Sequence, residues 1–205
     1  MNLGFFLRGL IIGFSIAAPV GPIGVLCIRR SLADGARSGF ASGLGAATAD
    51  AIYGSIAAFG LTVISDILIG QQFLLRLIGG LFLCYLGLWT FLARPPGQMA
   101  PAAENRLLDA YASTLFLTLT NPLTILSFAA VFAGFGMSSA GRGYGSAAQL
   151  VLGVFVGSAL WWLVLSTGAG RLRTRFAARH FQWINTASGA VIAAFGLIAL
   201  LSLHR

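Results

Sequence analysis

One acidic residue stands alone inside a long apolar stretch of this sequence. Asp50 lies about halfway along Gly39–Ile64, a run of otherwise apolar and small polar residues. A charge at the centre of a membrane costs at least about 2.5–3.5 kcal/mol on insertion scales, so an intramembrane acid usually has a function. Because an apolar environment favours the neutral acid, this carboxyl group could take up and release a proton, or it could pair with an ammonium group. The alternative is a hydrogen-bonded Asp50 that only satisfies backbone groups of a nearby broken helix.

Two proline-containing breaks are the second feature that could take part in binding. Ala18–Gly24 reads Ala-Pro-Val-Gly-Pro-Ile-Gly within the first apolar run, and Asn121-Pro122 lies within the fourth. Proline removes a backbone N–H and clashes with the carbonyl four residues earlier, so each helix should be interrupted there. In lipid the freed groups need partners, and each break must therefore face protein or a water-filled cavity. The positive end of a restarting half-helix suits a carboxylate and exposed carbonyls suit an ammonium group, which together fit a zwitterion.

These features predict one binding site for a substrate or a proton. Its predicted residues are Pro19, Gly21, Pro22, Asp50, Tyr53, Thr120, Asn121 and Pro122. Tyr53 is included because it lies three residues after Asp50, on the same face of a helix. Further hydrogen bonds could come from Ser15, Thr118 and Thr124. The alternative is that the prolines only kink their helices and that the aromatic residues, including Trp161 and Trp162, only pack.

The composition places these residues in an integral membrane protein. Of the 205 residues, 58% are hydrophobic and 9% are charged, whereas a soluble domain carries about 25% charged residues. A spanning helix needs about 20 mostly apolar residues. The runs that qualify are Phe5–Ile28, Gly39–Ile64, Phe73–Leu92, Ala110–Phe135, Ser146–Thr167 and Phe181–Leu203. We therefore expect an all-α, multi-pass protein of six transmembrane helices in a single domain, 1–205.

The distribution of arginine predicts the orientation. All 13 basic residues are arginines, and most of them follow the first, third and fifth apolar runs. The positive-inside rule then places those three connections in the cytoplasm and both termini outside. Because the arginines collect between apolar runs, the net charge of +8 indicates topology and contact with lipid headgroups, and no nucleic-acid surface is expected. Arg29 and Arg30 are assigned to this role.

The sequence also predicts an internal repeat. A linker over 94–109 divides it into a first repeat at 1–93 and a second at 110–205. A shift of 100 matches the two breaks, a shift of 108 matches the second helices, including Asp50 with Ser158, and a shift of 109 matches the third helices. Three spans is an odd number, so the second repeat must enter the membrane from the opposite side. Inverted repeats with broken helices at matching positions are typical of transporters whose site lies near the bilayer midplane.

The run Gly13–Leu61 contains a Gly-Pro element in the first helix, a basic loop with Gly-x-x-x-Gly, and a second helix with an acidic residue and a late Gly-Leu. In these features it resembles the LysE/RhtB family of amino-acid exporters. Thr118–Phe128 resembles the family's Asn-Pro element in the fourth helix. One departure is Pro-Val-Gly-Pro where many members have Pro-Gly-Pro. The resemblance implies a secondary exporter of amino acids or related amphoteric solutes in the inner membrane, which we expect to be proton-coupled.

Other functions remain open from the sequence. An exporter of another solute or of a metal cation could use the same scaffold, although intramembrane Cys, His and acidic residues are scarce. A membrane thiol-redox protein would use Cys27 and Cys84, and a non-transporting scaffold would not need Asp50. No Walker A sequence is present, and no enzyme activity, cofactor or metal is expected. Stripes of small residues such as Gly39/Gly43 permit close helix packing, within the protomer or in a homodimer.

Overall fold

The described part of the chain folds entirely into helices. The computed structural model describes residues 3–19, 21–59, 71–92, 104–121, 124–128, 144–172 and 178–202. The helices are α1 (Leu3–Ala17), α2 (Pro22–Ala33), α3 (Ala36–Ala58), α5 (Gln72–Leu92), α6 (Glu104–Leu119), α8 (Tyr144–Leu172) and α9 (Ala178–Leu201). A short helical segment also lies at 124–128. The predicted all-α class is therefore confirmed for these residues.

The first apolar run is broken where the sequence predicts it. Helix α1 ends at Ala17, α2 begins at Pro22, and the two helices meet at an angle of 82°. Pro19 would face the carbonyl of Ser15 in a continuous helix, and Pro22 would face that of Ala18, but neither proline has an N–H to donate. Pro19 therefore lies between the two helices and belongs to the break itself.

Three helical stretches in the described residues are long and apolar enough to cross a membrane. They are Phe73–Leu92, Tyr144–Leu172 and Gln182–Leu201, and the bent pair α1 and α2 would make a fourth. Helix α3 coincides with the second predicted span but is rich in glycine and small residues, and the end of that span, 60–64, lies outside the described residues. Helix α6 has 16 residues. The number of six spans thus stays a prediction.

The predicted linker is shorter than 94–109. Helix α6 begins at Glu104, so the last six residues of that segment are helical. The reason is local, because the last proline of the segment is Pro101 and the chain then continues with good helix formers such as Glu104, Arg106 and Leu107. Residues 93–103 lie outside the described part of the chain.

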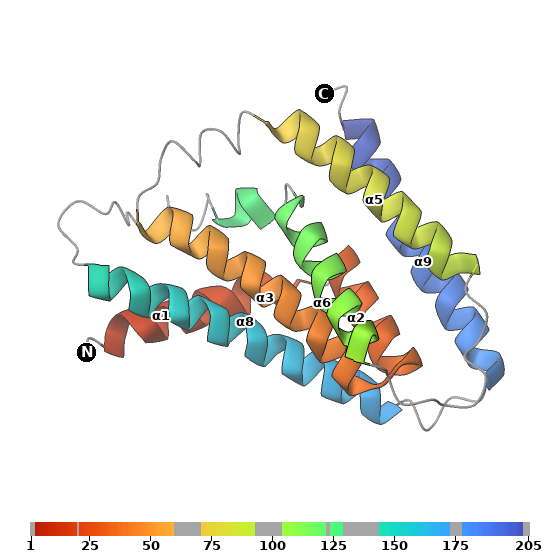
Figure 1. The fold of residues 1–205 in the computed structure, drawn as a ribbon, viewed down its shortest axis with the longest axis horizontal. Helices are drawn as coiled ribbons and strands as arrows, with labels where there is room; N and C mark the ends of the chain where they lie inside the picture. Colours follow the sequence, from red (N-terminus) through yellow and green to blue (C-terminus); the bar gives the residue numbers. More distant parts are fainter. Residues whose placement is uncertain are drawn as a thin grey trace.

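The helices pair across the two halves of the chain. Helix α1 packs along α8, α6 packs along α3, α3 and α8 pack on each other at the centre, and α5 packs along α9 (Figure 1). Helix α2 contacts α3, α8 and α9. The first helix of each half thus lies against the second helix of the other half.

Glycine contacts show that the α3–α6 and α1–α8 pairs are packed in a similar way. A Cβ added at Gly45 of α3 would lie 2.3 Å from the carbonyl oxygen of Tyr111 in α6. A Cβ added at Gly153 of α8 would lie 2.2 Å from the carbonyl oxygen of Phe6 in α1. Gly45 and Gly153 are the pair matched by the shift of 108, and each allows its helix to touch the backbone of the neighbouring helix.

The contact between α5 and α9 is reciprocal. A Cβ at Gly87 would lie 2.5 Å from the backbone nitrogen of Ala193, and a Cβ at Gly196 would lie 2.8 Å from that of Cys84. Both Gly87 with Gly196 and Cys84 with Ala193 are separated by 109 positions. Gly80 comes earlier in α5 than Gly87, but it lies beside Gly196, which comes later in α9 than Ala193. The two helices therefore run antiparallel.

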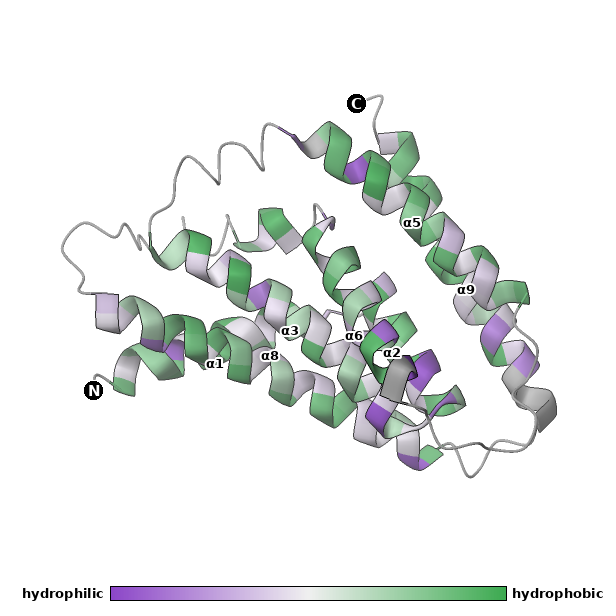
Figure 2. Cartoon of the chain, in the orientation of Figure 1, coloured by the Kyte–Doolittle hydropathy of each residue, from purple (hydrophilic) through white to green (hydrophobic). Residues whose placement is uncertain are grey.

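Hydrophilic residues gather at the end of the bundle where α2 and α8 end and α6 and α9 begin (Figure 2). Arg30 of α2 hydrogen-bonds there to two other helices. Its guanidinium reaches Ser42 Oγ of α3 at 2.8 Å, and Ala110 O at 2.9 Å, Ser113 Oγ at 2.9 Å and Thr114 Oγ1 at 3.0 Å of α6. Arg29 donates from Nε to Asn185 Oδ1 of α9 at 3.1 Å. Beyond the topological role expected of them, both arginines therefore tie helices together.

The close contact at Gly153 leads to a stability prediction. Gly153→Val should destabilise the protein by about 1–3 kcal/mol or more, because the new side chain would collide with the backbone of α1. Gly168→Val, in the same helix, is the matched control because a Cβ there meets nothing within 4 Å. Thermal unfolding in detergent measures both variants, and equal melting temperatures would contradict the prediction.

Candidate functional site

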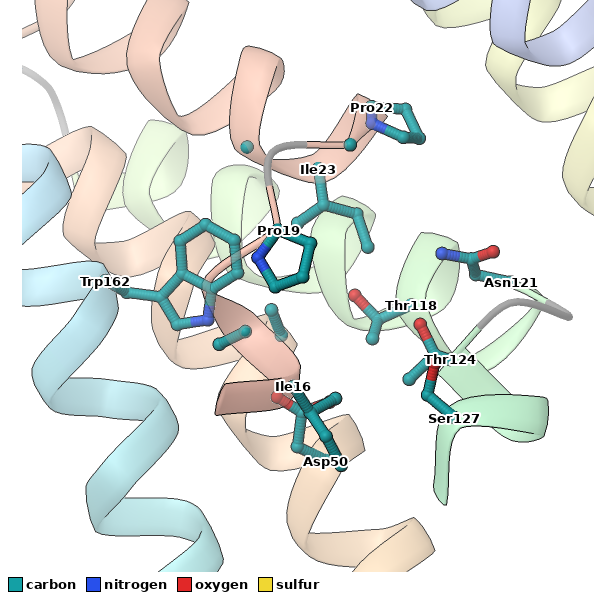
Figure 3. A pocket seen from close by; sticks show the side chains of 14 residues that line it. Ile16, Pro19, Pro22, Ile23, Asp50, Thr118, Asn121, Thr124, Ser127 and Trp162 are labelled. Carbon is teal, nitrogen blue, oxygen red and sulfur yellow. The ribbon is translucent and has the colours of Figure 1, made fainter. Parts of the chain in front are cut away.

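A cavity of about 300 Å³ lies against the break between α1 and α2. Helices α1, α2, α3, α6 and α8 and the segment at 124–128 all contribute to its wall. The lining residues are Ile16, Ala17, Pro19, Gly21, Pro22, Ile23, Gly24, Ala46, Asp50, Thr118, Asn121, Thr124, Ser127 and Trp162. Figure 3 shows Trp162 on one side of Pro19 and the hydroxyl groups of Thr118, Thr124 and Ser127 on the other. The wall therefore combines apolar surface with a few polar groups, as small-molecule sites do.

Most of the residues predicted for a site line this cavity. Pro19, Gly21, Pro22, Asp50 and Asn121 are among them, and so are Thr118 and Thr124. Of the remaining predicted residues, Thr120 lines a different cavity, while Tyr53 and Ser15 line neither. Pro122 lies outside the described residues. The structure thus brings residues about 100 positions apart together at one place.

Asp50 is held by a short chain of hydrogen bonds. Its side chain is 3% exposed, and Ser158 Oγ donates to its Oδ2 at 2.7 Å. Trp162 Nε1 donates to Ser158 Oγ at 3.1 Å. Because an indole N–H can only donate, Ser158 must accept from Trp162, which leaves its own hydroxyl proton for Asp50. These two residues of α8 thus hold one carboxylate oxygen of Asp50 in place.

Asp50 is the sole ionisable residue among the described lining residues of the cavity. In the described part of the chain no Arg or His forms an ion pair with it, and the structure gives its Oδ1 no hydrogen-bond partner. A buried carboxylate without a countercharge is costly, so this group favours either a bound proton or a bound cation. Both fit the chemistry expected of it from the sequence.

The N-terminus of α2 faces the same cavity. Gly21 is its N-cap residue and Pro22 its first helical residue, and no side chain caps the helix. The backbone N–H of Val25 bonds to the carbonyl of Gly21, whereas Ile23 and Gly24 belong to the first turn, whose N–H groups have no partner within the helix. Both residues line the cavity. The positive end of the helix dipole and these N–H groups make this side of the cavity suitable for an anion.

The second break restarts its helix in the same way. The N–H of Ile125 bonds to the carbonyl of Asn121, as the N–H of Val25 bonds to that of Gly21, at a shift of 100. Before the breaks, however, the packing of Phe6 and Tyr111 on matched glycines corresponds to a shift of 105. The first half therefore has five more residues between the packed residue and the restart, part of them in α1 itself, and this longer segment contains Pro19.

Tyr53, predicted to line the site beside Asp50, instead bonds to the backbone of α6. Its hydroxyl donates to the carbonyl of Leu119, the last residue of α6. This carbonyl is one of the groups that a helix end leaves without an intrahelical partner. Tyr53 thus satisfies the backbone at the second break and ties α3 to α6.

Three residues of the site were not predicted as such. Trp162 and Ser127 line the cavity, and Ser158 holds Asp50. The sequence contained a signal for Ser158, since the shift of 108 matches it with Asp50, and Trp162 lies one helical turn beyond it. Ser127 carried no signal beyond its place after Asn121-Pro122.

The described residues form neither a metal site nor a disulfide. They contain no group of three or more His, Cys, Asp or Glu side chains that could hold a metal ion. Cys27 of α2 is buried, Cys84 of α5 is half-buried against Ala193 of α9, and both are free thiols.

The hydrogen bond at the second break can be tested. Tyr53→Phe should lower stability by about 1–3 kcal/mol, because it removes the hydrogen bond to the partly buried Leu119 carbonyl. Tyr111→Phe removes a similar link between α6 and α3, from Tyr111 Oη to Thr48 Oγ1, but leaves no backbone group unsatisfied, so its effect should be smaller. Unfolding of both variants in detergent provides the comparison, and a larger loss in Tyr111→Phe would refute this account.

Comparison with known proteins identifies the family. The LysE type translocator family matches residues 14–203. The chain is 25% identical over 198 residues to the "Putative amino acid efflux protein YcgF" of Bacillus subtilis (strain 168), which covers 95% of this chain and 94% of that protein. It is 26% identical over 174 residues to the "Uncharacterized membrane protein YahN" of Escherichia coli (strain K12), covering 83% and 77%. No solved structure gives a significant match. The chain therefore belongs to the LysE type translocator family, a family of membrane transporters.

Proposed function

We propose that this protein exports amino acids, or closely related small amphoteric solutes, across the inner membrane. The observation that carries the proposal is that Asp50 and the N-terminus of α2 line one cavity. The carboxyl of Asp50 would pair with the ammonium group of the solute, and the N-terminal N–H groups of Ile23 and Gly24 would bind its carboxylate. The family membership and the printed name of the Bacillus relative agree with this proposal.

Asp50 would also couple export to the proton gradient. A single carboxyl group cannot hold a proton and an ammonium ion at the same time. Protonation of Asp50 from outside would therefore release the solute, and loss of the proton to the cytoplasm would prepare the site for the next solute. Ser158 would keep the carboxyl in place through both states, because it bonds to Oδ2 only, and Trp162 would hold Ser158 in position.

Two inverted repeats would supply the movement that alternates access. The shifts of 108 and 109 are supported by the reciprocal contacts of Gly87 and Gly196 and by the matched packing of Gly45 and Gly153. Equivalent helices that run antiparallel, as α5 and α9 do, are related by an axis perpendicular to them. Such an axis lies in the membrane plane, which is the arrangement of inverted repeats in transporters.

The arginine-rich end of the bundle would face the cytoplasm. Arg29 and Arg30 lie there, and Arg171 at the end of α8 lies at the same end. Under the positive-inside rule the connections after α2 and α8 are then cytoplasmic. The cavity at the break would open alternately toward this end and toward the outside.

The role of Asp50 is tested by an export assay. Cells that express the protein are loaded with dipeptides, and amino-acid efflux is followed at several external pH values. Asp50→Asn should lower efflux by about tenfold or more and remove its dependence on pH, because the amide takes up no proton and pairs weakly with ammonium. Asp34→Asn, at the C-cap of α2 and outside the cavity, should leave efflux unchanged.

The amino-acid assignment fails if wild-type efflux of every amino acid tested equals that of cells lacking the protein. The proton assignment fails if Asp50→Asn, present in the membrane at the wild-type level, retains both the rate and the pH dependence.

A second variant tests the cavity at the break. Gly21 lines this cavity, and a Cβ added at Gly21 would meet no atom within 4 Å. Its φ of −106° is one that other residues adopt freely. Gly21→Val should therefore fold normally but obstruct the cavity, lowering efflux by about tenfold or more. Gly145→Val, where a Cβ also meets open space, is the control. Normal efflux by Gly21→Val would remove this cavity from the transport route.

A further inference from the structure

A second cavity of about 290 Å³ lies on the other side of the break. It lies between the break, the end of α6 and the α5–α9 pair. Its lining residues are Pro19, Gly21, Pro22, Gly79, Gly80, Leu83, Leu117, Thr120, Asn121, Phe195, Ile198 and Ala199. Apart from Thr120 and Asn121, the side chains in this wall are apolar.

The two cavities share a wall. Pro19, Gly21, Pro22 and Asn121 line both of them. Gly21 has no side chain, and a Cβ added there would meet no atom within 4 Å, so Gly21 itself contributes only backbone to this wall. A solute bound at Asp50 in the first cavity therefore lies next to an apolar space of similar volume.

The charges of the two cavities differ in a way that selects solutes. Asp50 is the sole ionisable residue among the described lining residues of the first cavity, and those of the second include none. Asp50 can neutralise one ammonium group. A solute with a second charge on its side chain would have to place that charge in apolar surroundings without a partner, which is strongly unfavourable.

We infer that the second cavity holds the side chain of the exported amino acid and that the protein prefers uncharged, apolar side chains. This inference rests on the proposed function. The ammonium group would face Asp50, the carboxylate would face the N-terminus of α2, and the side chain would pass Gly21 and Asn121 into the space beside Leu83 and Ala199. The apolar wall would favour leucine, isoleucine, valine or phenylalanine over alanine, because each buried methylene group adds to the binding free energy.

A lipid acyl chain is the other occupant with matching chemistry. Phe195 and Ile198 are exposed on α9, so a chain from the bilayer could reach this region. The shared wall with the Asp50 cavity favours the side chain of the solute, since an acyl chain has no group for Asp50 or for the helix N-terminus.

The test uses the purified full-length protein in liposomes and measures exchange of labelled leucine, phenylalanine, alanine and lysine. Wild-type protein should exchange leucine about tenfold or more faster than lysine at equal concentration. Ala199→Phe fills the second cavity and should slow leucine exchange by about tenfold while changing alanine exchange little. Phe195→Ala enlarges the cavity and should raise phenylalanine exchange relative to leucine.

Leu197→Phe is the matched control, because Leu197 is exposed on α9 and lines neither cavity. It should leave all four rates unchanged. If lysine exchanges as fast as leucine, or if Ala199→Phe slows all substrates equally, the side-chain pocket is refuted while amino-acid export stands. If correctly folded wild-type protein exchanges none of the four amino acids, the proposed function is refuted instead.

Discussion

The architecture around the site depends on one requirement, that backbone polar groups freed by proline must find partners away from water. Between α1 and α2 the residues of the uncapped first turn of α2 line a cavity, and at the end of α6 the hydroxyl of Tyr53 donates a hydrogen bond to the carbonyl of Leu119. The helices α3 and α8 then have to pack closely around the breaks, which their glycines allow. A cavity with polar backbone in an otherwise apolar bundle follows directly from these constraints.

The contact between α3 and α8 connects the breaks to the chemistry. Asp50 and Ser158 occupy matched positions of the two halves, and they bond to each other. If a two-fold axis relates the two halves, as proposed, a matched pair of residues that touch lies near that axis. The carboxyl group would then lie where both halves meet, and a movement of one half against the other would shift the α3–α8 contact that holds Asp50.

The sequence was informative wherever a property of single residues decided the structure. Proline cannot continue a helix, so the break at Ala18–Gly21 could be predicted, and a lone acid in an apolar run identified Asp50. Partners set by tertiary packing could not be predicted: Tyr53 bonds to Leu119 although Asp50 is its neighbour in sequence, and Thr120 lies on the far side of the break. The predicted repeat matched Asp50 with Ser158, but matched positions need not touch. The linker ended early because prolines mark where a helix cannot form, and the residues after Pro101 are good helix formers.

The five additional residues before the restart of α2 have an energetic consequence. Two identical halves of opposite orientation would produce inward-open and outward-open states of equal free energy. Here the segment from the packed residue to the restart is longer in the first half and contains Pro19, so the two halves would not bend alike. If the halves are inverted repeats, as proposed, exchange of conformations between such unlike halves would yield two states of unequal free energy. An empty carrier built in this way would rest facing one side of the membrane, and its turnover would be limited by the uphill return.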